Sequence, residues 1–144
     1  MVILRKKPDW IMLFNEFMEK NRSKRFIWGS WDCVLFSNSF IKYITGNNLL
    51  PKEWKWKNEE EAIKSIKKFG KNKGLANAID NACKKVKGIE RVDPMYISKG
   101  DLVVYKEETE LCGISDGFKV LTPSKTGLAS KNDIHIVGVW RINV

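Results

Sequence analysis

The fold of this chain is decided by residues 26–33, which read FIWGSWDC and stand directly before an apolar segment. Asp32 belongs to the residue types that cap helix N-termini, because its carboxylate accepts hydrogen bonds from backbone N–H groups that lack helical partners. Apolar side chains then recur at helical spacing as far as Ile44, and Gly46 is a stop. The sequence therefore predicts a helix that follows Asp32, has Cys33 in its first turn and is buried on most sides.

A cysteine in the first turn of a helix has two interpretations. Unpaired N–H groups at a helix start favour a thiolate and bind developing oxyanions, and nucleophilic cysteine enzymes place their cysteine there for both reasons. The alternative is that Cys33 is a small buried residue at the start of a helix. Position alone favours this structural alternative.

The residues up to 98 are otherwise mainly helical in pattern. We expect a first helix over residues 8–22, and a third after Asn58, where an Asn cap is followed by three glutamates. A fourth covers about 75–85. The segment 49–57 reads as a loop, and we expect its tryptophans, Trp54 and Trp56, to be exposed candidates for a partner interface, with core packing as the alternative.

The pattern changes to strands at Gly100-Asp101. We expect strands at 102–105, 111–115 and 118–121, with Asp116-Gly117 as a hairpin turn, then a loop that contains Pro123, Gly127 and Ser130, and a last strand over 134–142. Helices followed by antiparallel strands indicate an α+β fold in a single domain, residues 1–144. Residues 1–98 would form its mainly helical half and residues 99–144 its antiparallel sheet.

Composition and charge limit the function classes. Hydrophobic residues make up 43% and aromatic residues 11% of the chain, which is enough for a packed core and argues against disorder. The net charge of +9 lies in residues 1–98, whereas residues 99–144 are balanced. We favour a solvated, lysine-rich surface, because the lysines are dispersed and no nucleic-acid module is recognisable. Contact with an anionic polymer or an acidic protein stays open as the alternative.

The three cysteines are far apart, which fits a reducing compartment. Cys83 and Cys112 are expected in the core. With one histidine, His135, and no closely spaced ligand pair, the sequence predicts no metal site, and nothing in it calls for a cofactor. The start of the chain does not have the order of a secretory signal, and no apolar window is long enough for a membrane span.

Three short elements resemble the NlpC-type papain-like cysteine peptidases. The motif F-x-W-G-x-x-D-C, with Trp28, Gly29, Asp32 and Cys33, is similar to their nucleophile motif. Residues 99–103 resemble the Gly-Asp strand that opens their sheet, and residues 111–114 resemble the next strand, usually His-x-Gly-Ile. This resemblance implies a papain-like fold in which Cys33 holds the nucleophile position, its helix packs on the sheet and, in an active member, peptidoglycan peptides are cleaved.

A closer resemblance is to an uncharacterised family of phage tail-gene modules and prophages. Its members carry F-x-W-G-x-x-D-C, then G-D, G-I and G-L, and end in W-R plus an aliphatic residue. This chain has Gly127-Leu128 and Trp140-Arg141-Ile142 in that order. The resemblance implies a virion protein, made in the host cytoplasm, whose partners are other virion or tail proteins.

Two departures bear on activity. Leu111 stands where the peptidases keep their general-base histidine, and Phe26 stands where they keep a tyrosine whose hydroxyl helps an oxyanion. His135 could approach Cys33 from the last strand as a substitute base, or be an ordinary strand histidine. We favour a phage virion or tail-module structural protein with a degenerate peptidase fold. The alternatives are an active cysteine peptidase or amidase and a basic nucleic-acid-associated protein.

Overall fold

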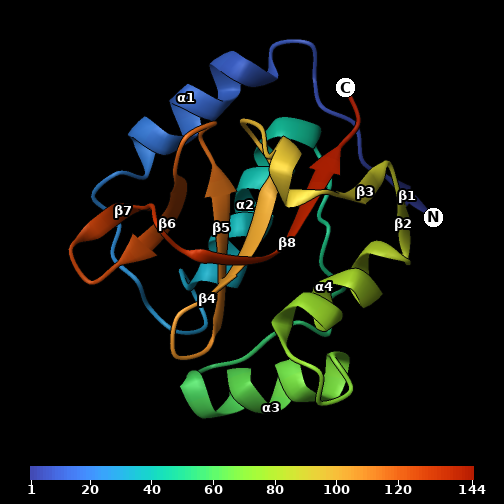
Figure 1. Ribbon diagram of the computed structural model, residues 1–144, viewed down its shortest axis with the longest axis vertical. Helices are drawn as coiled ribbons and strands as arrows, with labels where there is room; N and C mark the ends of the chain where they lie inside the picture. The colour runs from blue at the N-terminus through green and yellow to red at the C-terminus, as the bar shows by residue number, and fades with distance from the viewer.

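The helix that begins at Cys33 packs against one face of an antiparallel sheet. In the computed structural model, which describes residues 1–144, this helix is α2 (Cys33–Thr45). Figure 1 shows α2 behind the sheet, α1 (Trp10–Lys20) along the upper edge, and α3 (Glu59–Phe69) with α4 (Leu75–Cys83) at the lower end. The fold is α+β, as the sequence predicted.

The sheet has six strands in the order β3-β8-β4-β5-β6-β7, and all its neighbouring strands are antiparallel. The strands are β3 (Ile89–Val92), β4 (Leu102–Lys106), β5 (Glu110–Ser115), β6 (Val120–Ser124), β7 (Gly127–Lys131) and β8 (His135–Ile142). A bulge between Val104 and Tyr105 shifts the register of β4 against β8. Two short strands, β1 (Val2–Ile3) and β2 (Val86–Lys87), pair with each other outside this sheet.

The core lies between α2 and the sheet. Phe36, Phe40 and Ile44 of α2 are fully buried, as the apolar pattern predicted, and Phe17 of α1 packs its ring against Phe36 and Phe40. Burial of each such side chain contributes about 1.5–3 kcal/mol. Gly46 ends α2 in the left-handed conformation, with φ of 88°. No helix combines the length and the hydropathy that crossing a membrane requires.

The caps of α3 agree with the sequence pattern. The Asn58 side chain accepts a hydrogen bond from the N–H of Glu61 at 2.9 Å, and glutamates fill the first turn. Lysines lie in the last turn, where their charge complements the helix dipole. The helix therefore begins and ends where local chemistry predicts.

Two expectations about the loops were wrong. Trp54 and Trp56 are each only 5% exposed, because residues 49–57 fold back onto the start of α2 and onto Phe69, on which Trp54 stacks with ring centres 5.0 Å apart. Much of the segment expected as a loop around Pro123 and Gly127 instead forms the β6–β7 hairpin, since these residues lie at strand ends beside the turn. The helical half also supplies β3 to the sheet, so the division at residue 98 is only approximate.

Candidate functional site

Cys33 is the first residue of α2, and Asp32 is its N-cap. Oδ1 of Asp32 accepts hydrogen bonds from the N–H groups of Val34 at 3.1 Å and Leu35 at 3.0 Å. The prediction that Cys33 lies in the first turn of a helix packed on the sheet is confirmed. Only 5% of Cys33 is exposed, so its thiol faces the protein interior.

The second carboxylate oxygen of Asp32 also accepts two hydrogen bonds. Oδ2 accepts from the N–H of Gly29 at 3.0 Å and from the indole Nε1–H of Trp56 at 2.7 Å. This fully buried carboxylate therefore receives four hydrogen bonds. The N–H groups of Val34 and Leu35, which could have served a thiolate or an oxyanion, are used by Asp32, whose own negative charge opposes a second one beside it.

The other motif residues build the turn that places Asp32. Gly29 has φ of 84°, and a Cβ atom there would lie 2.4 Å from the carbonyl oxygen of Trp56, so only glycine fits. Backbone hydrogen bonds between Ile27 and Trp31 close the turn. Trp28 packs edge-on against Phe26, with ring centres 4.9 Å apart. Trp28, Gly29 and Asp32 of the motif thus have a structural explanation.

The polar atoms near Cys33 are a hydroxyl and a second thiol. Ser37, one turn later on α2, donates its Oγ–H to the carbonyl oxygen of Cys33 at 2.7 Å, and the same Oγ lies 3.6 Å from Sγ of Cys112. Cys112 is on β5 and fully buried. Burial raises the pKa of Cys112 well above its ordinary value, and interaction with the neighbouring Cys33 thiol raises it further. Neither group is a general base at neutral pH.

The residues considered for the base do not complete the site. His135 is the first residue of β8, is exposed and pairs with Lys106 at the end of the sheet. No hydrogen bond joins it to Cys33. Leu111, at the position where the peptidases keep their histidine, pairs with Tyr105. The structure therefore gives the thiol no imidazole partner, and no three acidic, histidine or cysteine side chains gather as a metal site would require.

Two further elements of the motif series meet in space. The guanidinium of Arg141 donates from Nε to Oδ1 of Asp101 at 2.9 Å and from a terminal nitrogen to Oδ2 at 2.8 Å. Asp101 is fully buried and also accepts from the N–H of Ser98 at 2.8 Å. The hydrogen bond that Arg141 donates to Asp101 raises the pKa of Arg141. From the sequence, Asp101 was placed only at the start of the strand region, and its pairing with Arg141 was not predicted.

The match to a known family extends over these elements. Residues 5–142, from the segment before α1 to the end of β8, match a family described as Domain of unknown function (DUF6950). The chain belongs to the DUF6950 family. No curated protein matches it. The matched segment of this DUF6950 chain contains both the Asp32–Trp56 contact and the Asp101–Arg141 pair.

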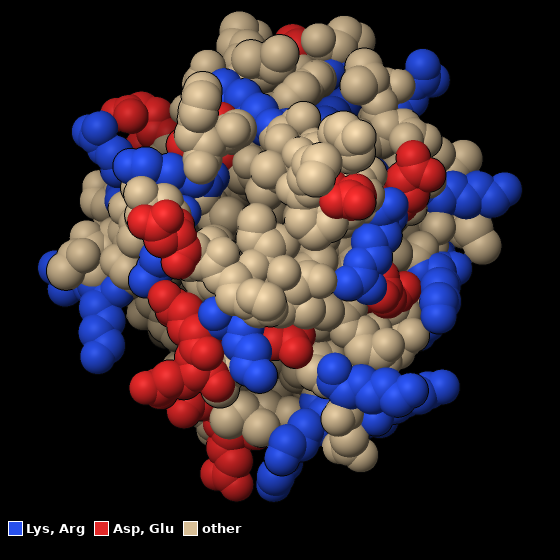
Figure 2. Space-filling model, in the orientation of Figure 1, with Lys and Arg blue, Asp and Glu red and all other residues tan.

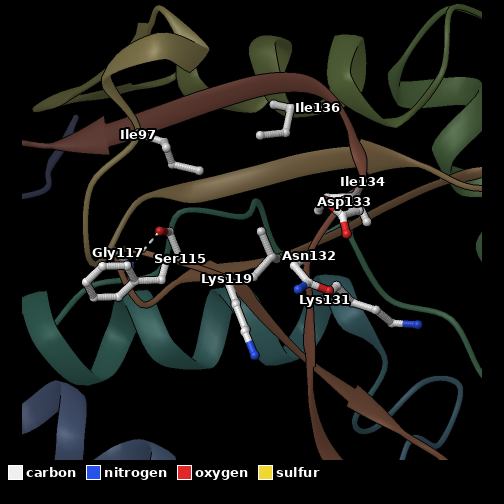
Figure 3. A pocket seen from close by; sticks show the side chains of 11 residues that line it. Ile97, Ser115, Gly117, Lys119, Lys131, Asn132, Asp133, Ile134 and Ile136 are labelled. Atoms are coloured by element: carbon white, nitrogen blue, oxygen red, sulfur yellow. Dashed lines mark hydrogen bonds between the residues drawn. The ribbon is translucent and has the colours of Figure 1, made fainter.

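Two cavities of this DUF6950 chain lie on opposite faces of the sheet. A space of about 10 Å³ between α2 and β5, lined among others by Ser37 and Cys112, has room for no more than one water molecule. A cavity of about 270 Å³ lies on the other face, away from α2. Figure 3 shows Ile97, Ile134 and Ile136 around this second cavity, which Phe118 also lines.

Phe118 is a candidate interaction residue that the sequence analysis did not single out. It lies at the turn between β5 and β6 and is 94% exposed. The N–H groups of Phe118 and Lys119 bond to the Asp116 carboxylate at 2.8 and 2.7 Å, so the turn is well fixed. The sequence does contain a signal for this exposed aromatic side chain, because the phenylalanine directly follows an Asp-Gly turn.

Proposed function

We propose that this chain is a structural or assembly protein of a phage virion or tail, built on a degenerate NlpC-type papain-like fold. One observation carries the loss of catalysis: the Asp32 carboxylate takes the N–H groups of Val34 and Leu35 while the Cys33 thiol beside it is buried and has no imidazole partner. The site is organised as a helix cap and not as a nucleophile.

The rate enhancement that this site lacks is large. General acid–base assistance is worth about 10²–10⁴-fold in rate, and nothing near Cys33 supplies it. A missing oxyanion donor costs about 10²–10³-fold, and Phe26 has no hydroxyl to offer. Without general acid–base assistance and without this oxyanion donor, Cys33 would hydrolyse amides only very slowly. The space beside Cys112 is also too small to admit a peptide.

The assignment to a phage virion or tail rests on motifs that occur in the same order as in the phage tail-module family. The Asp101–Arg141 pair supports that resemblance physically, because it joins the G-D and W-R elements into one contact. These elements are accounted for by folding, as are Gly29 and Asp32. An assembly component requires a stable fold but no catalytic centre, which agrees with motif residues that serve folding.

The surface for the partner is the open face of the sheet. Met95 and Tyr96, in the short 3₁₀ helix η1 (Pro94–Tyr96), are 81% and 66% exposed, and Ile97 after them lines the same cavity as Phe118. Figure 2, which views this face, shows a continuous uncharged area at its centre with charged side chains around it. Exposed aromatic side chains beside a cavity lined by both apolar and polar residues favour another virion or tail protein that inserts a side chain there.

The basic charge does not point to a nucleic-acid interface on this face. Figure 2 shows the lysines and arginines spread around the outline, with acidic side chains among them. Binding to nucleic acid needs basic side chains gathered along a groove or stripe. The dispersed arrangement favours the solvated surface expected from the sequence.

Activity is tested by assaying the wild-type protein and Cys33→Ala side by side on peptidoglycan fragments. We expect no release of peptides above background from either. Turnover by the wild type that vanishes in Cys33→Ala would contradict the structural role and establish the peptidase.

Assembly is tested in the phage or prophage that encodes the chain, with variants supplied in trans. We expect the wild-type chain to be present in purified particles and Phe118→Ser to be depleted from them. Ile63→Ser is the matched control, since Ile63 is an exposed apolar residue on α3, at the lower end of the molecule (Figure 1). Absence of the wild-type chain from particles would overturn the virion assignment.

A further inference from the structure

Two buried thiols lie where α2 meets β5, and Ser37 of α2 contacts one of them. Cys33 and Ser37 are four residues apart and share a face of α2. The Ser37 hydroxyl bonds to the carbonyl of Cys33 and lies 3.6 Å from Sγ of Cys112, which places Cys112 against this face. Both cysteines are buried and free. Neither the helix cap nor the core packing around the two cysteines requires a thiol group at these positions.

We propose that Cys33 and Cys112 form a redox-active pair, which hydrogen peroxide converts into an intrachain disulfide between α2 and β5. The proposal goes beyond the structural role and does not depend on it. A papain-like nucleophile position without a base would then retain a slow thiol chemistry in place of acyl transfer.

The two cysteines have different roles. Cys33 retains 5% exposure at the helix start, whereas Cys112 has none, so peroxide reaches Cys33 first. The raised pKa of Cys112 keeps its proton in place at neutral pH, so Cys112 does not compete for peroxide and its attack in the second step is slow. Because Cys33 is only 5% exposed, we expect its oxidation to be slow compared with that of a dedicated peroxidase.

The steps balance as follows. The sulfur of Cys33 attacks one oxygen of hydrogen peroxide, the O–O bond breaks, and the second oxygen leaves as water with the thiol proton, which leaves Cys33 as a sulfenic acid. The sulfur of Cys112 then attacks the Cys33 sulfur, the S–O bond breaks, and a second water leaves with the Cys112 proton. Two thiols are oxidised to one disulfide, and one peroxide is reduced to two waters.

The test uses the folded full-length protein, hydrogen peroxide, alkylation of the remaining thiols and peptide mapping without reductant. We expect a cross-linked peptide that joins Cys33 to Cys112, reversed by a dithiol reductant. Cys83→Ser is the matched control, because Cys83 is the third free cysteine and lies on α4; it should leave the cross-link unchanged.

The single variants separate the two steps. In Cys112→Ser, a sulfenic acid trap such as dimedone should label Cys33; in Cys33→Ser, Cys112 should stay reduced. A wild-type protein whose Cys33 passes to sulfinic acid without a cross-link, a cross-link through Cys83, or no oxidation before unfolding would each overturn the pair. The wild-type cross-link decides the question even if a variant fails to fold.

Discussion

The indole Nε1–H of Trp56 donates a 2.7 Å hydrogen bond to Oδ2 of Asp32, across 24 positions of sequence. This contact holds the loop of residues 49–57 against the start of α2 and completes the four hydrogen bonds to the Asp32 carboxylate. The side chain expected to face a partner is therefore part of the support for the helix cap.

Trp56→Phe should destabilise the protein by about 1–3 kcal/mol, because the buried Asp32 carboxylate loses a donor while most of the apolar packing is kept. The free energy of unfolding is measured by urea denaturation. Trp28→Phe is the matched control, since Trp28 is half-buried and its indole N–H has no protein acceptor; equal losses in the two variants would show that the Asp32 contact contributes nothing.

Gly29→Ala should be more destabilising than Gly46→Ala, although the two glycines have similar φ values of 84° and 88°. Gly46 has open space, with the nearest atom to a new Cβ at 3.9 Å, so its substitution costs only backbone strain of about 1 kcal/mol. At Gly29 a Cβ would meet the Trp56 carbonyl oxygen at 2.4 Å, which adds about 1–3 kcal/mol. Chemical denaturation of both variants measures the difference, and similar values would argue against the close approach.

Arg141→Leu should cost roughly 2 kcal/mol, because it leaves the fully buried Asp101 carboxylate without its bidentate partner. This loss of stability is smaller than for a fully buried ion pair, because Arg141 is one-third exposed and water can reach Asp101 once the guanidinium is gone. Arg22→Leu, which breaks an exposed pair with Glu19, should change stability by less than about 0.5 kcal/mol. A wild-type unfolding midpoint in Arg141→Leu would refute the structural role of the pair.

Stability should fall as the pH rises from about 9 toward 12. Burial, with the nearby Asp80 charge, raises the pKa of Cys83 to about 12 from an ordinary value of 9.0, and burial also raises the pKa of Cys112. In this window unfolded thiols lose their protons while folded ones keep them, so the unfolded state binds fewer protons and is favoured. Each thiol contributes at most about 1.4 kcal/mol per pH unit.

Urea unfolding of wild type and Cys83→Ala at several pH values measures this effect, and the lysines that titrate in the same range cancel in the comparison. The variant should show a shallower decline of the unfolding free energy with pH. Parallel curves for the two proteins would mean that Cys83 ionises equally in the folded and unfolded states.

The sequence by itself determined the elements whose signals are local. Asp32 and Asn58 cap helices through N–H groups two or three residues away, and Gly46 ends α2 through its own φ, so position in the chain is enough to predict them. The same holds for the Asp116-Gly117 turn and for the succession of helices followed by strands that indicated the α+β class.

Only the tertiary structure decided which side chains meet across long stretches of chain. The burial of Trp56, its bond to Asp32 and the pairing of Asp101 with Arg141 depend on how loops and strands pack. The same is true of the contact of Cys112 with Ser37 of α2. An indole or a carboxylate has the same local pattern whether it faces solvent or a partner, because the energy that buries it comes from contacts with residues distant in sequence.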